Sequence, residues 1–232
     1  MSSLKKLSYF VFCVVLASCA ITKQTVAETS VIYDVDYFKS LNNDESWLTS
    51  ERSSISFNKG DAKNCEDYLE LSKNSLIEES SKNFLIKSEY LECEVLSLVK
   101  NSHAKTVDLK SAAELPSDFG TTLSQRLDIT SFNSSLGQIT SDEKNTLATL
   151  FPNAITQDSN NLTIETNSRY FNLRLVAKTY LNNNQQEDWI VIVTDEILDG
   201  TYRNFDTIII NDPETNEQFL LTAKSFLHIQ KN

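Results

Sequence analysis

Five consecutive apolar residues in the last quarter of the chain constrain its fold more than any other feature. Trp189 to Val193 contains no polar position, whereas a strand with one face in water alternates apolar and polar side chains. Because successive side chains of a strand point to opposite faces, both faces of this strand must be covered. We therefore predict a central strand whose isoleucines, Ile190 and Ile192, face one way, and whose Trp189, Val191 and Val193 face the other.

The segments around this run follow the same two-residue period. Leu162 and Ile164 alternate with polar residues. Four apolar residues then share one face of a strand with polar residues mostly opposite: Phe171, Leu173, Leu175 and Ala177. The apolar runs 208–210 and 219–221 follow. The joints 182–187, 199–200 and 211–213 are short and polar, and the second is Asp-Gly, a strong hairpin signal. Such joints are too short for the crossover that a parallel pair needs. We therefore predict an antiparallel meander of four to five strands within 156–232.

The N-terminal half carries a helical period instead. Apolar stripes at three- and four-residue spacing predict two helices between 64 and 100, with a polar turn at 78–81. In an antiparallel helical hairpin, residues equidistant from the turn lie side by side, and Cys65 and Cys93 are equidistant from residue 79. We predict that they form a disulfide that closes the hairpin. Two buried free thiols are the alternative.

These patterns together predict an α+β fold: an N-terminal disulfide-closed helical hairpin and a C-terminal antiparallel sheet. We expect residues 46–155 to be mainly helical and 156–232 to form the sheet, packed together as one domain. Within the first region, Thr140 and Glu143 have the spacing of a capping box, which predicts a helix that ends near Phe151. Residues 19–45 are interpreted as a tether that leads into the fold.

The N-terminus has the layout of a secretory signal. Two lysines precede a short apolar run that ends in Leu16-Ala17-Ser18-Cys19. This ending resembles the lipobox of bacterial lipoprotein signal peptides. The resemblance implies that residues 1–18 are removed, that Cys19 carries the lipid, and that Ala20 after it directs the protein to the outer membrane. An ordinary signal peptide and an uncleaved anchor are the alternatives, although the run is far shorter than the about 20 residues that span a bilayer.

The charge of the chain limits its partners. The formal net charge is −11, and such a surface repels nucleic acid and anionic lipid headgroups. We therefore expect no nucleic-acid partner, and we expect the lipid on Cys19 to supply the membrane affinity. Outside the cytoplasm disulfides persist, which agrees with the predicted Cys65–Cys93 bond.

Motifs for catalysis, cofactors and metals are weak. The chain has two histidines, and it contains no nucleophile elbow, zinc-helix, dinucleotide or phosphate-loop motif. The loop 182–188 departs from calcium-loop patterns at several ligand positions. We predict no catalytic residue, no cofactor and no metal site. A hydrolase of cell-wall or surface polymer stays an alternative, because two carboxylates can pair in space without a linear motif.

Polar residues at the ends of the predicted central strand form a candidate binding patch. Tyrosine and arginine are favoured at interface hot spots, and here they lie close in sequence to acidic residues: Asp188, Asp195, Glu196, Tyr202 and Arg203. The alternative is that the carboxylates only solvate a strand end and that the arginine pairs with one of them. We expect a lipid-anchored, periplasm-facing module that binds or assembles an envelope protein. The other hypotheses are the polymer hydrolase and a carrier of a small apolar ligand between sheet and helices.

Overall fold

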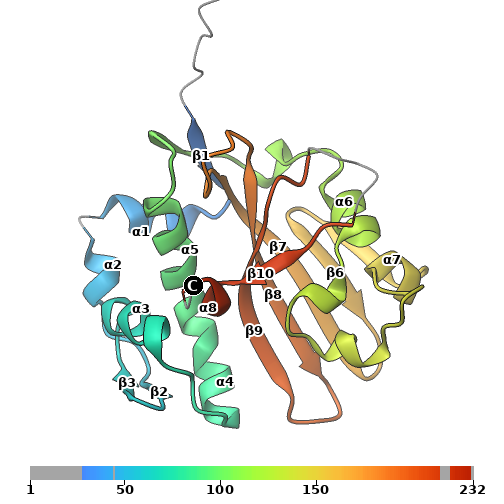
Figure 1. Cartoon of the computed structure of the whole chain (residues 1–232), viewed down its shortest axis with the longest axis horizontal. Helices are drawn as coiled ribbons and strands as arrows, with labels where there is room; N and C mark the ends of the chain where they lie inside the picture. Colours follow the sequence, from blue (N-terminus) through green and yellow to red (C-terminus); the bar gives the residue numbers. More distant parts are fainter. Residues whose placement is uncertain (1–27, 44, 215–219, 231–232) are drawn as a thin grey trace, which may run out of the picture.

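The computed structural model describes residues 28–43, 45–214 and 220–230. The expected signal peptide 1–18, the expected lipid attachment site Cys19 and the first part of the expected tether lie outside the described residues. Within these ranges, no helix has both the length and the apolar character needed to cross a bilayer. The fold is α+β, with helices on both faces of one sheet (Figure 1).

A mixed sheet of eight strands forms the centre of the described chain. Its strands are β1 (Thr29–Ile32), β4 (Thr106–Leu109), β5 (Ile155–Asp158), β6 (Asn161–Glu165), β7 (Arg169–Thr179), β8 (Asp188–Ile197), β9 (Arg203–Ile210) and β10 (Ala223–Ser225). The spatial order is β10-β9-β8-β7-β1-β4, and β6 pairs with β7 and with β5. Strand β7 is long enough to hold β6 along its first half and β1 near its end.

The C-terminal strands are antiparallel, as the short joints predict. Each strand from β5 to β10 pairs antiparallel with the next one. The last strand differs from the prediction, because it begins at Ala223 rather than at 219. Leu221 instead makes an isolated bridge to Leu127, and Phe219 lies outside the described residues.

The prediction of a purely antiparallel sheet of four to five strands is wrong. Strand β1 pairs parallel with β4 and antiparallel with β7, so the N-terminal half contributes two strands to the same sheet. The crossover between β1 and β4 carries five helices, which is the long connection that a parallel pair requires. Short joints connect only the strands from β5 onward.

Six α-helices lie on one side of the sheet, five of them from the crossover (Figure 1). They are α1 (Val35–Asn42), α2 (Ser46–Thr49), α3 (Cys65–Asn74), α4 (Ser81–Lys87), α5 (Leu91–Lys100) and, from the C-terminus, α8 (Phe226–Ile229). A small hairpin of β2 (Ile55–Phe57) and β3 (Gly60–Ala62) completes this layer.

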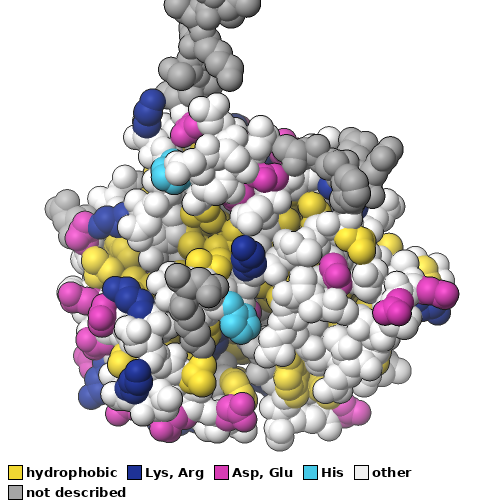
Figure 2. Space-filling view, viewed as in Figure 1, with side chains coloured by type: hydrophobic (Ala, Val, Ile, Leu, Met, Phe, Trp, Pro, Cys, Tyr) yellow, Lys and Arg dark blue, Asp and Glu magenta, His cyan; other side chains and the backbone are white. Residues whose placement is uncertain are grey.

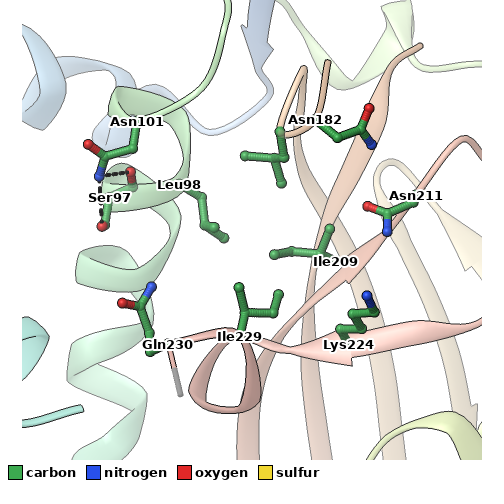
Figure 3. A pocket seen from close by; sticks show the side chains of 10 residues that line it. Ser97, Leu98, Asn101, Asn182, Ile209, Asn211, Lys224, Ile229 and Gln230 are labelled. Atoms are coloured by element: carbon green, nitrogen blue, oxygen red, sulfur yellow. Dashed lines mark hydrogen bonds between the residues drawn. The ribbon is translucent and has the colours of Figure 1, made fainter. Parts of the chain in front are cut away.

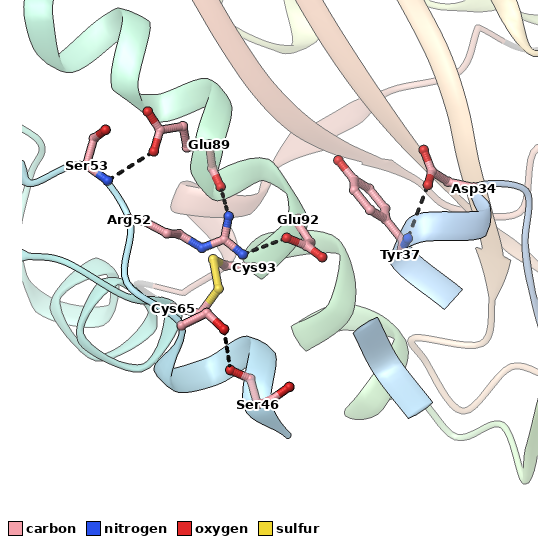
Figure 4. Close-up of polar contacts among 10 residues, drawn as sticks. Asp34, Tyr37, Ser46, Arg52, Ser53, Cys65, Glu89, Glu92 and Cys93 are labelled. Carbon is pink, nitrogen blue, oxygen red and sulfur yellow. Dashed lines mark hydrogen bonds and ion pairs between the residues drawn. A yellow bond between two sulfur atoms is a disulfide. The ribbon is translucent and has the colours of Figure 1, made fainter. Parts of the chain in front are cut away.

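A disulfide joins Cys65, the first residue of α3, to Cys93 in α5, with 5.2 Å between the Cα atoms (Figure 4). The chain between them is more than a plain turn, because Ile77 bridges to Phe57 of β2. A 3₁₀ turn, Ser88–Tyr90, also separates α4 from α5. Closing a loop of this length stabilises the fold by about 3–4 kcal/mol in the chain-entropy model.

Arg52 reinforces the same junction. Its guanidinium Nη2 lies 2.6 Å from Glu92 Oε2, and its Nη1 donates to the backbone carbonyl of Glu89 at 2.5 Å (Figure 4). The Glu89 carboxylate in turn accepts from the backbone N–H of Ser53 at 3.0 Å. The start of α5 is therefore held by a covalent bond and by an ion pair from a segment that precedes it in sequence.

The opposite face of the sheet is covered by residues 115–151. They include α6 (Phe119–Arg126), α7 (Leu147–Leu150) and short 3₁₀ turns. The two apolar clusters divide the central strand as predicted: Trp189, Val191 and Val193 lie in the cluster with α6, and Ile190 and Ile192 lie in the cluster with α5. The prediction that both faces of this strand are covered is confirmed.

Candidate functional site

The five residues of the predicted patch lie at two separate ends of β8. Asp188 opens the strand and Asp195 lies near its other end, about 23 Å away at about 3.3 Å per residue. Asp188 is fully buried, and its carboxylate accepts from the backbone N–H groups of Leu181 at 2.8 Å and Asp212 at 3.3 Å. Burial raises the pKa of this carboxyl. Asp188 therefore holds two loops together rather than facing solvent.

The other four patch residues gather at the far end of β8. Asp195 is fully buried and accepts from the backbone N–H and the hydroxyl of Ser135 at 2.5 and 2.7 Å. The Tyr202 hydroxyl also donates to Asp195, at 3.3 Å. Burial, followed by the Asp195 charge, raises the pKa of Tyr202. Arg203 pairs with Glu196 at 3.6 Å, so each of the four is engaged within the protein.

A cavity of about 310 Å³ lies where α5, β10, α8 and the end of β9 meet (Figure 3). We call it the α5–α8 cavity. Four aliphatic side chains and six polar residues line it: Leu98, Leu181, Ile209 and Ile229, with Ser97, Asn101, Asn182, Asn211, Lys224 and Gln230. In Figure 3 the aliphatic groups of Leu98, Ile209 and Ile229 converge on the centre. Figure 2 shows hydrophobic side chains exposed near the middle of the molecular face in view.

Local sequence explains how each wall is formed. Leu98 belongs to the buried stripe of α5, and Asn101 caps the end of that helix with its side-chain N–H on the Ser97 carbonyl at 2.9 Å. Ile209 lies on the face of β9 that packs in the same apolar cluster as α5. The Asn182 amide donates to Asp188 at 3.3 Å, so the buried aspartate positions part of the rim.

Three polar side chains at the rim have unused hydrogen-bonding capacity. Neither a hydrogen bond nor an ion pair joins the side chains of Asn211, Lys224 and Gln230 to the rest of the described chain. Asn211 and Lys224 lie on the same side of the cavity, across from α5 (Figure 3). An aliphatic floor with a few free polar groups is the common composition of a ligand site.

A buried ionic cluster lies on the elements that form the cavity walls. The Lys87 ammonium lies 3.1 Å from Asp206 Oδ1 of β9 and 4.0 Å from Glu94 Oε1 of α5. It also donates to the Phe205 carbonyl at 2.5 Å, on the part of β9 that lies beyond its pairing with β10. Ser225 of β10 donates to Asp206 at 2.9 Å. The cluster therefore joins α4, α5, β9 and β10.

The cluster holds two carboxyl groups and one ammonium away from water. Tyr68 donates to Glu94 Oε1 at 2.5 Å, whereas Glu94 Oε2 has no hydrogen-bond partner among the described residues. Burial raises the pKa of Glu94, and the Lys87 charge opposes this shift. Burial lowers the pKa of Lys87, but Asp206 and Glu94 outweigh it, so the net shift is upward. The cluster fixes the spacing of the walls, since an unpaired charge there would be costly.

A second carboxylate pair bears on the hydrolase hypothesis. The Lys178 ammonium contacts Glu187 and lies 3.0 Å from Glu214 Oε1, at a smaller cavity of about 220 Å³. Both carboxylates are engaged by the same ammonium. A glycoside hydrolase needs an acid and a base or nucleophile that both face the substrate, and this arrangement does not offer them. Among the described residues, no group of three or more His, Cys, Asp or Glu has the geometry for a metal ion.

Searches with protein-family models, curated protein sequences and solved structures found no match to this chain. The described chain is an α+β protein with helices on both faces of a mixed sheet and a small cavity with an aliphatic floor at one end of the sheet.

Leu98 lies in the segment 64–100 that is predicted to be helical, and Ile209 lies in the predicted apolar run 208–210, but the sequence pattern assigns no site to either residue. The cavity forms where α5 meets α8, and no local pattern encodes that meeting. The ionic cluster did have a local signal: Glu94 is a charged residue between Cys93 and Val95, in a segment predicted to be a helix with apolar stripes.

Proposed function

We propose that this protein is a lipid-anchored, periplasm-facing module that binds an envelope protein by receiving an aliphatic side chain in the α5–α8 cavity. The observation that carries the proposal is the aliphatic floor beneath polar side chains that the described chain leaves unused. When an aliphatic side chain of the partner covers this floor, apolar surface of both proteins is removed from water, which favours association. The polar rim can satisfy backbone groups of the partner at the same time.

The proposed anchor and location rest on the Leu16–Cys19 lipobox and the acidic charge of the chain. An anchored module is confined near its membrane partners, which raises its effective concentration there. We also propose that α3 and the α4–α5 segment act as a hairpin closed by the Cys65–Cys93 disulfide. Its part in function would be to hold α5, one wall of the cavity, in a fixed position.

The size of the cavity favours a protein partner over the other candidates. Its volume of about 310 Å³ is at the low end of the about 300–1,000 Å³ range of small-molecule sites. This suits one short aliphatic group at the tip of a larger partner. A carrier of a small apolar ligand is the second candidate, because the same aliphatic floor supports it. The engaged Lys178 cluster gives the polymer hydrolase no comparable support.

Photo-crosslinking in the native envelope tests the proposal. A photoreactive residue at Asn101, on the rim, should give a light-dependent adduct with one protein, and the same residue at the exposed Lys59 should not. The variant Ile229→Trp fills the cavity from a half-buried position and should remove the adduct. Its melting temperature should match that of the parent protein, which shows that the fold is intact.

Two results would contradict the proposed partner binding. An adduct that survives Ile229→Trp would mean that the partner contacts the rim without using the cavity. A small molecule found by native mass spectrometry in protein extracted from its own membranes, and displaced by Ile229→Trp, would favour the carrier.

A further inference from the structure

The described lining of the α5–α8 cavity carries a positive charge and no negative charge. Lys224 is the single charged residue among the ten described residues that line it. Its ammonium forms no ion pair with the described chain, although the whole chain carries a formal net charge of −11. A lysine with no carboxylate partner in so acidic a protein leaves its three N–H donors for an incoming acceptor.

Two free amides extend this donor set. Asn211 lies beside Lys224 on the same side of the cavity (Figure 3), and Gln230 lies at its α8 end. Each amide offers two N–H donors and a carbonyl acceptor. Asp212, the acidic residue next to Asn211 in the sequence, is already engaged: both of its carboxylate oxygens accept from the Asn184 amide at 2.7 Å. The rim therefore favours an anion that also carries an N–H group.

The aliphatic floor specifies what must lie next to that anion. Leu98, Ile209 and Ile229 point to the centre of the cavity, between α5 and the Lys224 side (Figure 3). The ligand then needs a short aliphatic group within a few bonds of a carboxylate and of an N–H donor. The C-terminal residue of a protein has this combination, and capture of a terminal carboxylate is a known mode of peptide recognition.

We infer that the α5–α8 cavity binds the C-terminal residue of the partner, with its aliphatic side chain on the floor and its carboxylate at Lys224. This inference rests on the proposed function, because it names which part of the partner enters the cavity. The Asn211 and Gln230 amides complete the site by donating to the carboxylate and by accepting from the last backbone N–H.

Three probes and the lipidated protein in detergent micelles test the inference. The first probe is acetyl-Gly-Ser-Gly-Leu with a free carboxylate, the second is the same peptide as its C-terminal amide, and the third is isocaproate. Methyl NMR shifts of Leu98, Ile209 and Ile229 report binding at the cavity and give the Kd. We expect the free acid to bind about tenfold more tightly than the amide, which corresponds to about 1.4 kcal/mol.

Matched variants assign the difference to the ammonium. Lys224→Gln should make the acid and the amide bind equally, Lys224→Arg should keep most of the preference, and Lys59→Gln, on the exposed β2–β3 turn, should change nothing. Lys224 is exposed, so these variants keep the fold.

The outcomes separate the inference from the proposed function. Equal binding of acid and amide to the parent protein would overturn the inference and leave an aliphatic-side-chain site in place. Isocaproate binding as tightly as the acid peptide would overturn the protein terminus as the source of the ligand. The absence of cavity shifts with every probe would overturn the proposed function as well.

Discussion

Removal of the Lys87 ammonium is the sharpest test of the energetics of this fold. Lys87→Met keeps most of the volume of the side chain and leaves the carboxylates of Asp206 and Glu94 buried without their cation, 4% and 0% exposed. The Phe205 carbonyl also loses its donor. Breaking a buried ion pair by removing one partner costs about 3–5 kcal/mol, a large share of a typical stability of about 5–15 kcal/mol.

Urea unfolding followed by tryptophan fluorescence measures this cost, because Trp47 and Trp189 are both buried. At about 2–4 °C per kcal/mol for a domain of this size, the melting temperature should fall by roughly 6–20 °C. The control is Lys73→Met, which removes a pair with Glu70 whose two side chains are 50% and 70% exposed. That variant should lose at most about 1 kcal/mol.

The pH dependence of the same variant gives a second readout. Glu94 has a raised pKa because of burial, and Lys87 lowers it; without the ammonium this pKa rises further. A protonated Glu94 carries no buried charge, so the penalty of Lys87→Met should shrink as the pH falls through the raised pKa of Glu94. A Lys87→Met variant that matches the Lys73→Met control at every pH would refute the cluster as a structural element.

Four further predictions follow from the sequence and the fold. Glu94→Gln should flatten the pH dependence of stability. In the parent protein the pKa of Glu94 is raised, so stability falls as the pH rises from the ordinary carboxyl pKa through the raised value. Urea midpoints at several pH values would show whether the variant loses this slope. Reduction of the disulfide should cost about 3–4 kcal/mol, measured as the drop in the urea midpoint with reductant. Ile190→Asp and Val191→Asp should each abolish soluble folded protein, because each places an unpaired carboxylate in one of the two apolar layers at a cost of several kcal/mol; normal folding of either variant would show that its face is open. Cys19→Ser should release the protein from membranes or leave it uncleaved, and a mature N-terminus other than lipidated Cys19 in mass spectrometry would disprove the lipobox assignment.

The sheet could be predicted where its strands carry a dense apolar pattern. The run from Trp189 to Val193 has no polar position, so its burial on both faces follows from composition alone. Strands β1 and β4 are four residues long, and β4 is mostly exposed. Their pairing depends on the tertiary arrangement of the crossover helices, and no local alternation encodes it.

The capping box was predicted one segment too early. Ser141 and Lys144 bridge to each other in a tight turn, so the helix predicted from Thr140 does not form there. Helix α7 begins at Leu147, and Thr146 and Thr149 form its capping box instead. Capping patterns mark a helix only when the residues after them can bury an apolar face, and Leu147 is the first to do so.

The candidate site was beyond local prediction for a geometric reason. Its walls come from α5, β9, β10 and α8, and Leu98 and Ile209 look like ordinary core residues in sequence. The lone cation Lys224 becomes informative only when the ten lining residues are known. The Cys65–Cys93 pair was predictable because both partners lie on periodic helical stripes within one short segment.

The place of β1 in the sheet sets the order in which the chain can assemble. Thr29 meets Thr106, 77 residues away, and Ser30 contacts Thr179, 149 residues away. One of the first described segments therefore finds its neighbours only after most of the chain has been made. Contacts this distant in sequence slow folding. The meander from β5 to β10 joins segments adjacent in sequence and can form first, so insertion of β1 between β7 and β4 would be the step that completes the sheet.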